Sequence, residues 1–243
     1  MRNLDNGAEV FLVGTAHVSR ASADEVRRVI RAVRPGTVVV ELCPARAARL
    51  MSPEPPRAPH EALAELLAAL GAPGGLSAKL LGLTMKGFYA AWRHAGLEPG
   101  AEFKVALQEA QTLRAKVVHG DRDVRDTLAA LAGTFSLSGA LRAAAAAPPP
   151  PPELARVLSA DVGVEEAIER LKNRRTVAAL TRHLRAIHPE GVRVMLDERD
   201  DVLAAALRAA EGRVVGVVGL AHVDGIEARW EVMNGRASAQ AAR

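Results

Sequence analysis

Two histidines near opposite ends of the chain complete the same short pattern. FLVGTAH ends at His17 and VVGVVGLAH ends at His222, so each histidine stands three residues after a glycine that follows an apolar run. Ligands of open α/β sheets bind beyond the carboxyl ends of the strands, where both histidines are expected. A single histidine there is more often an ordinary polar residue, but two in matching positions indicate one shared site. Gly14 and Gly219 would let a ligand approach the backbone closely.

A carboxylate supplies the third chemical group. Glu41 ends the run VVVE, where an apolar residue would be easier to bury, so it needs a cation, a hydrogen-bond donor or a proton. Two imidazoles and a carboxylate suit Mn²⁺, Fe²⁺, Co²⁺ or Zn²⁺ with positions left open for water. If the three strands are neighbours, the sequence predicts a divalent metal site of His17, Glu41 and His222. The alternative is an ion pair between Glu41 and an arginine such as Arg122.

Three further segments carry groups that could take part. In HGDRD, Arg122 could bind a carboxylate or phosphate through its planar guanidinium. A turn followed by a helix that Asp121 or Asp123 caps explains this segment equally well. DERD is most simply the acidic start of a helix, favoured by the helix dipole. Cys43 stands two residues after the strand glutamate and would share its face if the strand continued, which makes it a minor candidate ligand or nucleophile.

Several other catalytic patterns are incomplete. HEALA, at His60, begins like the zinc motif H-E-x-x-H but has Ala64 in place of the second histidine. The chain contains no G-x-S-x-G, no Walker A and no G-x-G-x-x-G sequence. The sequence therefore disfavours serine-hydrolase, P-loop and dinucleotide-binding functions.

Composition narrows the class of protein. The 243 residues can bury a sizeable core, and no apolar stretch approaches the roughly 20 residues that span a bilayer. We therefore expect no membrane span in this chain. The N-terminus lacks an apolar signal segment and Cys43 is the only cysteine, so a cytoplasmic protein is expected. The formal charge is +4, but arginines alternate with acids and aromatic residues make up only 3%, which argues against nucleic acid as a partner.

The pattern of apolar residues predicts an α/β fold, a mostly parallel sheet flanked by helices, with a helical insertion. A strand at 9–13, a helix at 22–33 and a strand at 37–43 form a βαβ unit. The third segment is apolar on both faces, which is typical of a central strand. Further strands are predicted at 116–119 and 213–218. A right-handed crossover would make the strands parallel, so their polar ends should meet at one edge.

The rest of the chain is predicted to be mainly helical. Helices are expected at 60–70, 77–94, 102–113, from about 124, 164–187 and 196–210. We interpret residues 1–243 as a single domain with helical insertions at about 44–115 and 143–190. The segment AAAAAPPPPP, at 143–152, is a stiff Ala/Pro linker that should be exposed and easily cleaved by proteases.

Six segments, in order, resemble the TraB family. They are FLVGTAHVS, VVVELC, PGAEFKVALQEA, HGDRD, DERD and VVGLAHVDGI, and the resemblance covers residues 9–227. That family includes the pheromone-shutdown proteins of bacterial conjugation and TraB-domain proteins of eukaryotes, and it is related to the Tiki metalloproteases and the GumN group. In the Tiki branch, paired Gly-x-x-His motifs and a strand glutamate are associated with metal-dependent proteolysis. The matching positions here are Gly14 and His17, Gly219 and His222, and Glu41.

Two functions of different classes follow. The first is a metal-dependent hydrolase of a peptide or amide bond, in which His17 and His222 hold Mn²⁺, Co²⁺ or Zn²⁺. Glu41 would be the third ligand or the general base, and Arg122 could hold a substrate carboxylate. The second is a non-catalytic module that sequesters a peptide or other small ligand in the same cleft, like a pheromone-shutdown regulator. A chelator should abolish the first function and leave the second intact.

Overall fold

The computed structural model describes residues 1–16, 20–52, 100–134, 146–157 and 173–241. His17 lies outside the described residues, as do the predicted helices at 60–70 and 77–94. In the described part of the Ala/Pro linker, residues 146–150 are exposed.

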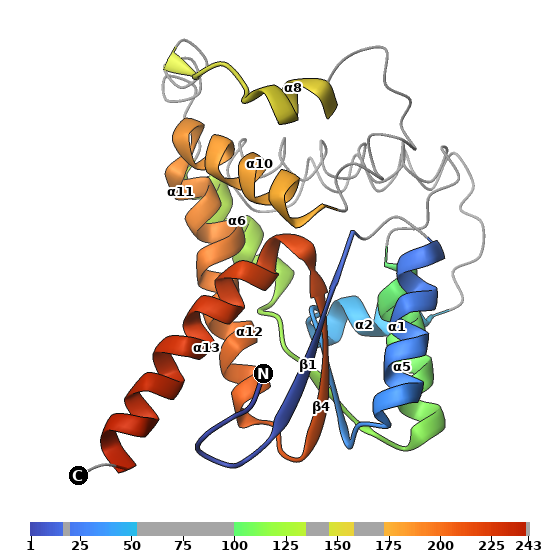
Figure 1. Cartoon of the computed structure of the whole chain (residues 1–243). Coiled ribbons are helices and arrows are strands. Elements are labelled where there is room, and N and C mark those ends of the chain that lie inside the picture. The colour runs from blue at the N-terminus through green and yellow to red at the C-terminus, as the bar shows by residue number, and fades with distance from the viewer. Residues whose placement is uncertain (17–19, 53–99, 135–145, 158–172, 242–243) are drawn as a thin grey trace.

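A sheet of four parallel strands forms the centre of the described structure (Figure 1). The strands lie in the order β1-β4-β2-β3, and every neighbouring pair is parallel. Their bounds are β1 (Glu9–Thr15), β2 (Thr37–Val40), β3 (Lys116–His119) and β4 (Arg213–Gly219). The predicted α/β fold is therefore confirmed. The first and last strands are neighbours, in a register that places Thr15 opposite Gly219.

The strand that carries the glutamate ends earlier than the sequence predicted. β2 stops at Val40, and α2 (Pro44–Met51) begins four residues later. Pro44 accounts for the difference, because its fixed φ suits the first position of a helix and Cys43 becomes the residue that precedes that helix. Glu41 is still tied to the sheet, since its N–H donates to the carbonyl of Val217 at 3.0 Å. It is therefore the first residue beyond the carboxyl end of β2.

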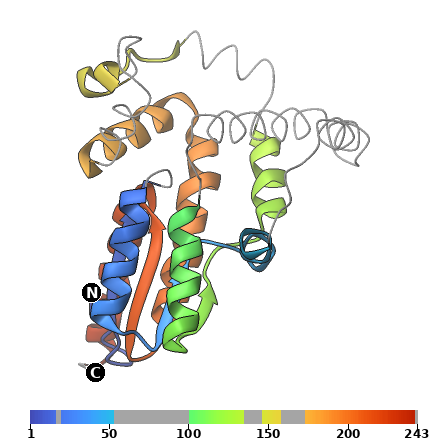
Figure 2. The ribbon, with the colours of Figure 1, turned by 90° about the vertical axis from the view of Figure 1, so that its right-hand side faces the viewer.

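Helices cover both faces of the sheet. On one face, α1 (Arg20–Val33) and α5 (Ala101–Leu113) pack over alternate valines of β2 and β4, and Figure 2 looks onto this layer. On the other face lie α12 (Glu198–Ala209) and α13 (Leu220–Ala241). Val38 and Val40 point into the first layer and Val39 into the second, so β2 is an interior strand buried on both faces, as predicted.

The remaining described helices gather beyond the carboxyl end of the sheet (Figure 1). They are α6 (Val124–Thr134), α8 (Pro152–Val157), α10 (Arg174–Ile187) and α11 (Pro189–Val192). A π-helical turn, η1 (Arg193–Asp197), joins α11 to α12. Helical backbone thus runs from Pro189 to Ala209, with the acidic segment DERD at the junction of η1 and α12. Glu198, Asp200 and Asp201 lie in the first turn of α12, as predicted, although η1 continues the helical backbone before them.

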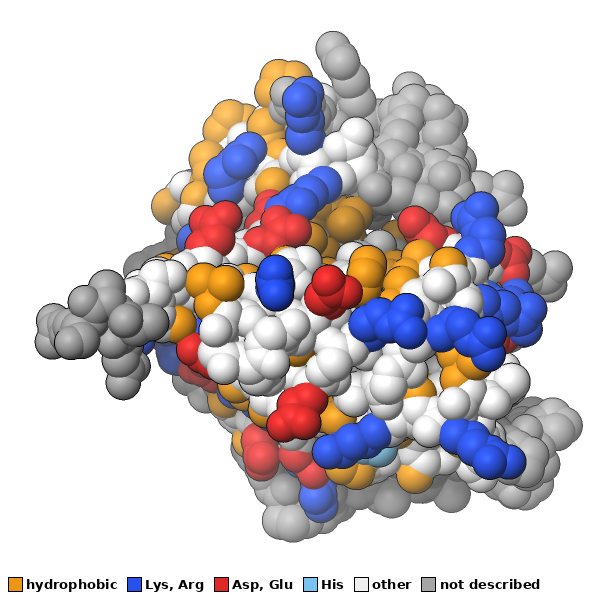
Figure 3. Space-filling view, turned by 60° about the horizontal axis from the view of Figure 1, so that its bottom comes forward, with side chains coloured by type: hydrophobic (Ala, Val, Ile, Leu, Met, Phe, Trp, Pro, Cys, Tyr) orange, Lys and Arg blue, Asp and Glu red, His pale blue; other side chains and the backbone are white. Residues whose placement is uncertain are grey.

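The surface far from the carboxyl edge is mixed in character. Figure 3 shows acidic and basic side chains there, with apolar side chains between them. No helix of the described ranges is long and apolar enough to cross a membrane.

Gly216 is a packing constraint in the middle of β4. A Cβ at this position would lie 2.7 Å from Leu207 Cδ2 and 3.1 Å from Leu12 Cδ1. We predict that Gly216→Ala lowers the free energy of unfolding by about 1–3 kcal/mol through overpacking. The measurement is urea denaturation. Gly133→Ala in α6, where nothing lies within 4 Å of the added carbon, is the matched control. Equal stability of the two variants would contradict this account of the core.

Candidate functional site

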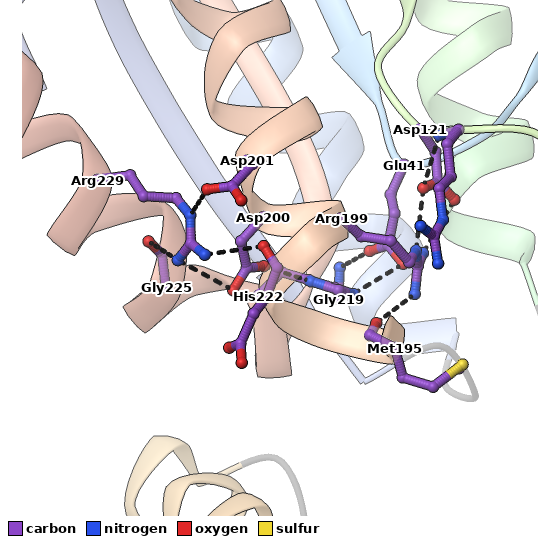
Figure 4. A network of polar contacts seen from close by, with 12 residues as sticks. Glu41, Asp121, Met195, Arg199, Asp200, Asp201, Gly219, His222, Gly225 and Arg229 are labelled. Atoms are coloured by element: carbon purple, nitrogen blue, oxygen red, sulfur yellow. Dashed lines mark hydrogen bonds and ion pairs between the residues drawn. The ribbon is translucent and has the colours of Figure 1, made fainter. Parts of the chain in front are cut away.

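Three strands and one flanking helix deliver charged side chains to the carboxyl edge of the sheet. Glu41 follows β2, Asp121 follows β3 by two residues, and His222 lies in the first turn of α13, directly after β4. Arg199 and Asp200 come from the start of α12. Figure 4 shows these side chains joined in one network, which we call the rim cluster, and all five are buried.

Glu41 is held on both carboxylate oxygens. Oε1 accepts from Arg199 Nη2, and Oε2 accepts from the backbone N–H of Gly219. Its side chain is only 6% exposed. The expectation that a carboxylate here needs a cation or a donor is therefore confirmed, but the cation is Arg199 and not Arg122.

Arg199 is the central cation of the rim cluster. Besides Glu41, it donates to both carboxylate oxygens of Asp121, from Nε at 3.0 Å and from Nη2 at 2.9 Å. Burial alone would lower the pKa of Arg199, but Glu41 and Asp121 outweigh it and raise the pKa above its ordinary value. The guanidinium therefore stays charged between two buried carboxylates.

The π-helical turn supplies carbonyl acceptors to two arginines. Arg199 Nη1 donates to the carbonyl of Met195 at 3.1 Å, and Arg122 Nη2 donates to that of Val194 at 2.9 Å. The turn is closed by the N–H of Glu198 on the carbonyl of Arg193, five residues earlier. Such turns often occur at functional sites. Here the turn fixes how the following residues of α12 face the sheet.

His222 lies between two carboxylates. Its Nδ1 is 2.6 Å from Asp200 Oδ1, and its Nε2 is 3.2 Å from Glu41 Oε1. Burial by itself lowers the pKa of His222, but the charges and hydrogen bonds of Glu41 and Asp200 raise it to about 9. Burial raises the pKa of Asp200, against the opposing effect of His222. At neutral pH the imidazole of this arrangement is therefore protonated.

The structure brings together two of the three predicted metal ligands. Glu41 and His222 are in contact, whereas His17 lies outside the described residues. The end of β1 at Thr15, paired with Gly219, places the start of the first motif at the same edge of the sheet. Convergence of all three side chains stays a prediction.

Arg122 is engaged elsewhere. It donates to Glu198 Oε2 at 2.6 Å and to Thr127 Oγ1 at 2.7 Å, so the predicted pairing with Glu41 is wrong. Asp123 accepts from the N–H of Arg125 at 2.8 Å at the start of α6, which confirms the capping interpretation of HGDRD.

Gly14, Gly219 and Cys43 each have a structural role in the fold. A Cβ on Gly14 would lie 2.7 Å from Val223 Cγ2, so this glycine lets α13 pack closely on β1. Gly219 offers its N–H to Glu41. Cys43 is buried just before α2 and does not continue the strand. Substrate contacts by Gly14, Gly219 and Arg122 remain predictions.

Sequence reasoning missed Asp121, Arg199 and Asp200 as members of one cluster. Both segments that contain them, HGDRD and DERD, stood out, but for other roles. An arginine enclosed by acids in DERD was the available signal, because such an arginine is expected to pair with carboxylates. Which carboxylates it meets depends on the phase of the helix, which η1 sets.

The rim cluster contains some of the ligand atoms that a divalent metal needs. Among the described residues, no three His, Cys, Asp or Glu side chains are grouped to hold an ion. Two atoms that could bind a metal, His222 Nε2 and Glu41 Oε1, lie 3.2 Å apart. Asp200 contacts the other imidazole nitrogen, as carboxylates next to metal-binding histidines commonly do. Three buried carboxylates of the rim cluster are matched by the buried guanidinium of Arg199 and by the partly exposed Arg46 and Arg229, which lie 3.5 Å from Asp121 and 3.6 Å from Asp200. The arrangement of His222 between Glu41 and Asp200 fits a cation, whereas the charge balance adds no support for one.

The raised pKa of His222 predicts a pH-dependent stability. The ordinary pKa is about 6.5, so the protonated imidazole stabilises the fold fully below that pH, and this contribution is lost as pH rises through about 9. The loss should reach about 3 kcal/mol. Urea denaturation between pH 6 and 10 in the presence of a chelator measures it. His222→Gln should flatten this part of the profile, and an equally steep decline in the variant would refute the assignment.

Removing the guanidinium of Arg199 should lower the stability of the fold. Arg199→Met removes the buried guanidinium that Glu41 and Asp121 share and leaves them only His222 and the partly exposed Arg46 as counter-charges, so we expect a loss of about 3–5 kcal/mol in the free energy of unfolding at pH 7. Arg193→Met is the control from the same helical run, because its side chain is half exposed and its ion pairs contribute about 0–1 kcal/mol. Similar stability of the two variants would show that Arg199 is not the counter-charge of the cluster.

Comparison with known proteins places these residues in a family context. The model of the TraB/PrgY/gumN family matches residues 2–234. The human TraB domain-containing protein is 29% identical over 248 residues, which cover 93% of this chain and 64% of the human protein. The bovine protein of the same name is also 29% identical, over 93% of this chain and 63% of its own length.

An archaeal relative extends the comparison. An uncharacterized protein of Methanocaldococcus jannaschii is 27% identical over 226 residues, covering 91% of this chain and 53% of that protein. The chain thus spans less than two thirds of the length of each of these relatives. Since the family match includes both Gly-x-x-His motifs and the whole rim cluster, the family resemblance seen in the sequence is confirmed, and the chain belongs to the TraB/PrgY/gumN family.

Proposed function

We propose that this chain is a metal-dependent hydrolase that acts on a peptide or amide bond. The observation that supports this most is the position of His222, buried at the carboxyl edge with Asp200 on one ring nitrogen and Glu41 on the other. A histidine held from behind by a carboxylate presents its second nitrogen in a fixed direction. His222 Nε2, Glu41 and His17 would hold the ion.

The ion would supply a polarised carbonyl and an activated water when bound. One carboxylate oxygen of Glu41 accepts a hydrogen bond from Arg199 and the other accepts one from the N–H of Gly219. Both contacts favour the ionised carboxylate. This makes Glu41 better suited to be a ligand than a general base. His222 must give up its proton to act as a ligand, so binding of the ion is coupled to proton release.

The charge of the site suggests a class of substrate, and the cysteine content suggests a cellular compartment. Once an ion occupies the cluster, its positive charge beside Arg199 favours a substrate whose reacting group gains negative charge, as an amide carbonyl does. The single cysteine of the chain, Cys43, cannot form a disulfide within it, which favours a reducing compartment such as the cytoplasm.

Metal content and peptide turnover of three variants test the proposal. His17→Ala, His222→Ala and Glu41→Gln should each lose bound Mn²⁺, Co²⁺ or Zn²⁺ and reduce turnover of a peptide library by about 100-fold or more. His119→Ala is the matched control, because this histidine is also at the carboxyl end of a strand, in β3, but is exposed and outside the rim cluster. Turnover that is unchanged in all three variants would sink the proposal.

A second candidate is a binding module that holds a peptide or small ligand without turnover. The full engagement of Glu41 by Arg199 and Gly219 favours it, because a carboxylate already balanced by a guanidinium has less need of a metal. This candidate predicts saturable ligand binding that survives a chelator and yields no product. Metal-dependent turnover would exclude it.

A further inference from the structure

We propose that Gly225 and Asp200 act as a positioning pair for His222. In this pair, the absence of a side chain at residue 225 makes room for the carboxylate that fixes the imidazole. Gly225 lies in α13, one helical turn after His222, and Asp200 approaches this face from α12. The inference deepens the proposed function, on which its consequence for metal binding rests.

The space beside Gly225 is filled by Asp200. A Cβ built on Gly225 would lie 1.9 Å from Asp200 Oδ2 and 2.7 Å from its Cγ. Real carbon atoms do not approach this closely, so one group must move. Asp200 cannot turn aside without loss, because its other oxygen is 2.6 Å from His222 Nδ1 and its short, buried side chain has few alternative positions.

No other feature of the backbone calls for glycine at this position. The glycines with positive φ among the described residues are Gly7, Gly100 and Gly212, so Gly225 has no conformation that a side chain would strain. Glycine is also a poor helix former, and α13 is a 22-residue helix. Gly235, in the same helix, has nothing within 4 Å of an added Cβ. Room for Asp200 is therefore the specific property of Gly225.

The two Gly-x-x-His motifs differ at this point. Three residues after His222 comes Gly225, but three residues after His17 comes Arg20. Only the second motif therefore continues as Gly-x-x-His-x-x-Gly. The positioning pair therefore belongs to the second motif alone. There, Nδ1 of His222 contacts Asp200 and Nε2 points toward Glu41.

Proton NMR of the metal-free protein tests the pair without any activity assay. An imidazole N–H bonded to a buried carboxylate is protected from exchange and gives a low-field resonance. Loss in His222→Gln assigns such a resonance to this imidazole, and retention in Glu41→Gln identifies the one on Nδ1, which faces Asp200. We expect this resonance at pH 7 in the wild type and in Gly235→Ala, and its loss in Gly225→Ala and Asp200→Ala. An unshifted resonance in Gly225→Ala would overturn the inference.

A double-mutant cycle by urea denaturation covers the case in which Gly225→Ala folds poorly. In the wild-type background this change should lower the denaturation midpoint. In the Asp200→Ala background, where the carboxylate is gone, the same change should raise the midpoint, because alanine is the better helix former. A drop of equal size in both backgrounds would show that Gly225 acts independently of Asp200 and would overturn the pair.

Metal titration separates this inference from the proposed function. If the wild-type protein binds Co²⁺ or Zn²⁺, Gly225→Ala should weaken binding by about 10- to 100-fold, as loss of an outer carboxylate typically does, while Gly235→Ala should not. Unchanged affinity in Gly225→Ala would overturn the pair as a support of the ligand. If the wild type binds none of Mn²⁺, Co²⁺ and Zn²⁺, the proposed function fails, and the resonance and the cycle still decide the positioning pair.

Discussion

The burial of Arg199 between Glu41 and Asp121 is the interaction on which the carboxyl edge of this sheet depends. β2 is buried on both faces and β3 is the edge strand beside it, and each is followed by a buried carboxylate, Glu41 or Asp121. A single guanidinium satisfies both, and the N–H of Gly219 takes the remaining oxygen of Glu41. That cation offsets the repulsion between the two carboxylates where the ends of β2 and β3 lie side by side.

Much of the scaffold could be predicted from sequence because its signals are local. The apolar runs of β2 and β4 are continuous, as expected of strands covered on both faces, and the polar residue that ends each run is visible directly. The end of β2 was misjudged because Pro44 starts a helix where apolar residues suggested more strand. Local chemistry overrode the pattern there.

The partners within the site could not be predicted in the same way. That Arg199 meets Glu41 and Asp200 meets His222 depends on the phase of α12, which is shifted by a π-helical turn that no simple periodicity reveals. The matching Gly-x-x-His endings indicated symmetry between the two motifs. In the described structure His222 contacts Asp200 from α12 and Glu41 after β2, and contacts between separate elements of this kind arise only from the tertiary fold.

The adjacency of Arg199 and Asp200 has a mechanical consequence. Consecutive residues of an α-helix point about 100° apart. The first turn of α12 therefore directs Arg199 toward Glu41 and Asp200 toward His222, in two different parts of the rim cluster. Rotation or sliding of this helix would displace the guanidinium and the carboxylate at the same time. The electrostatic balance of Glu41 and the orientation of His222 would therefore both change if this helix moved.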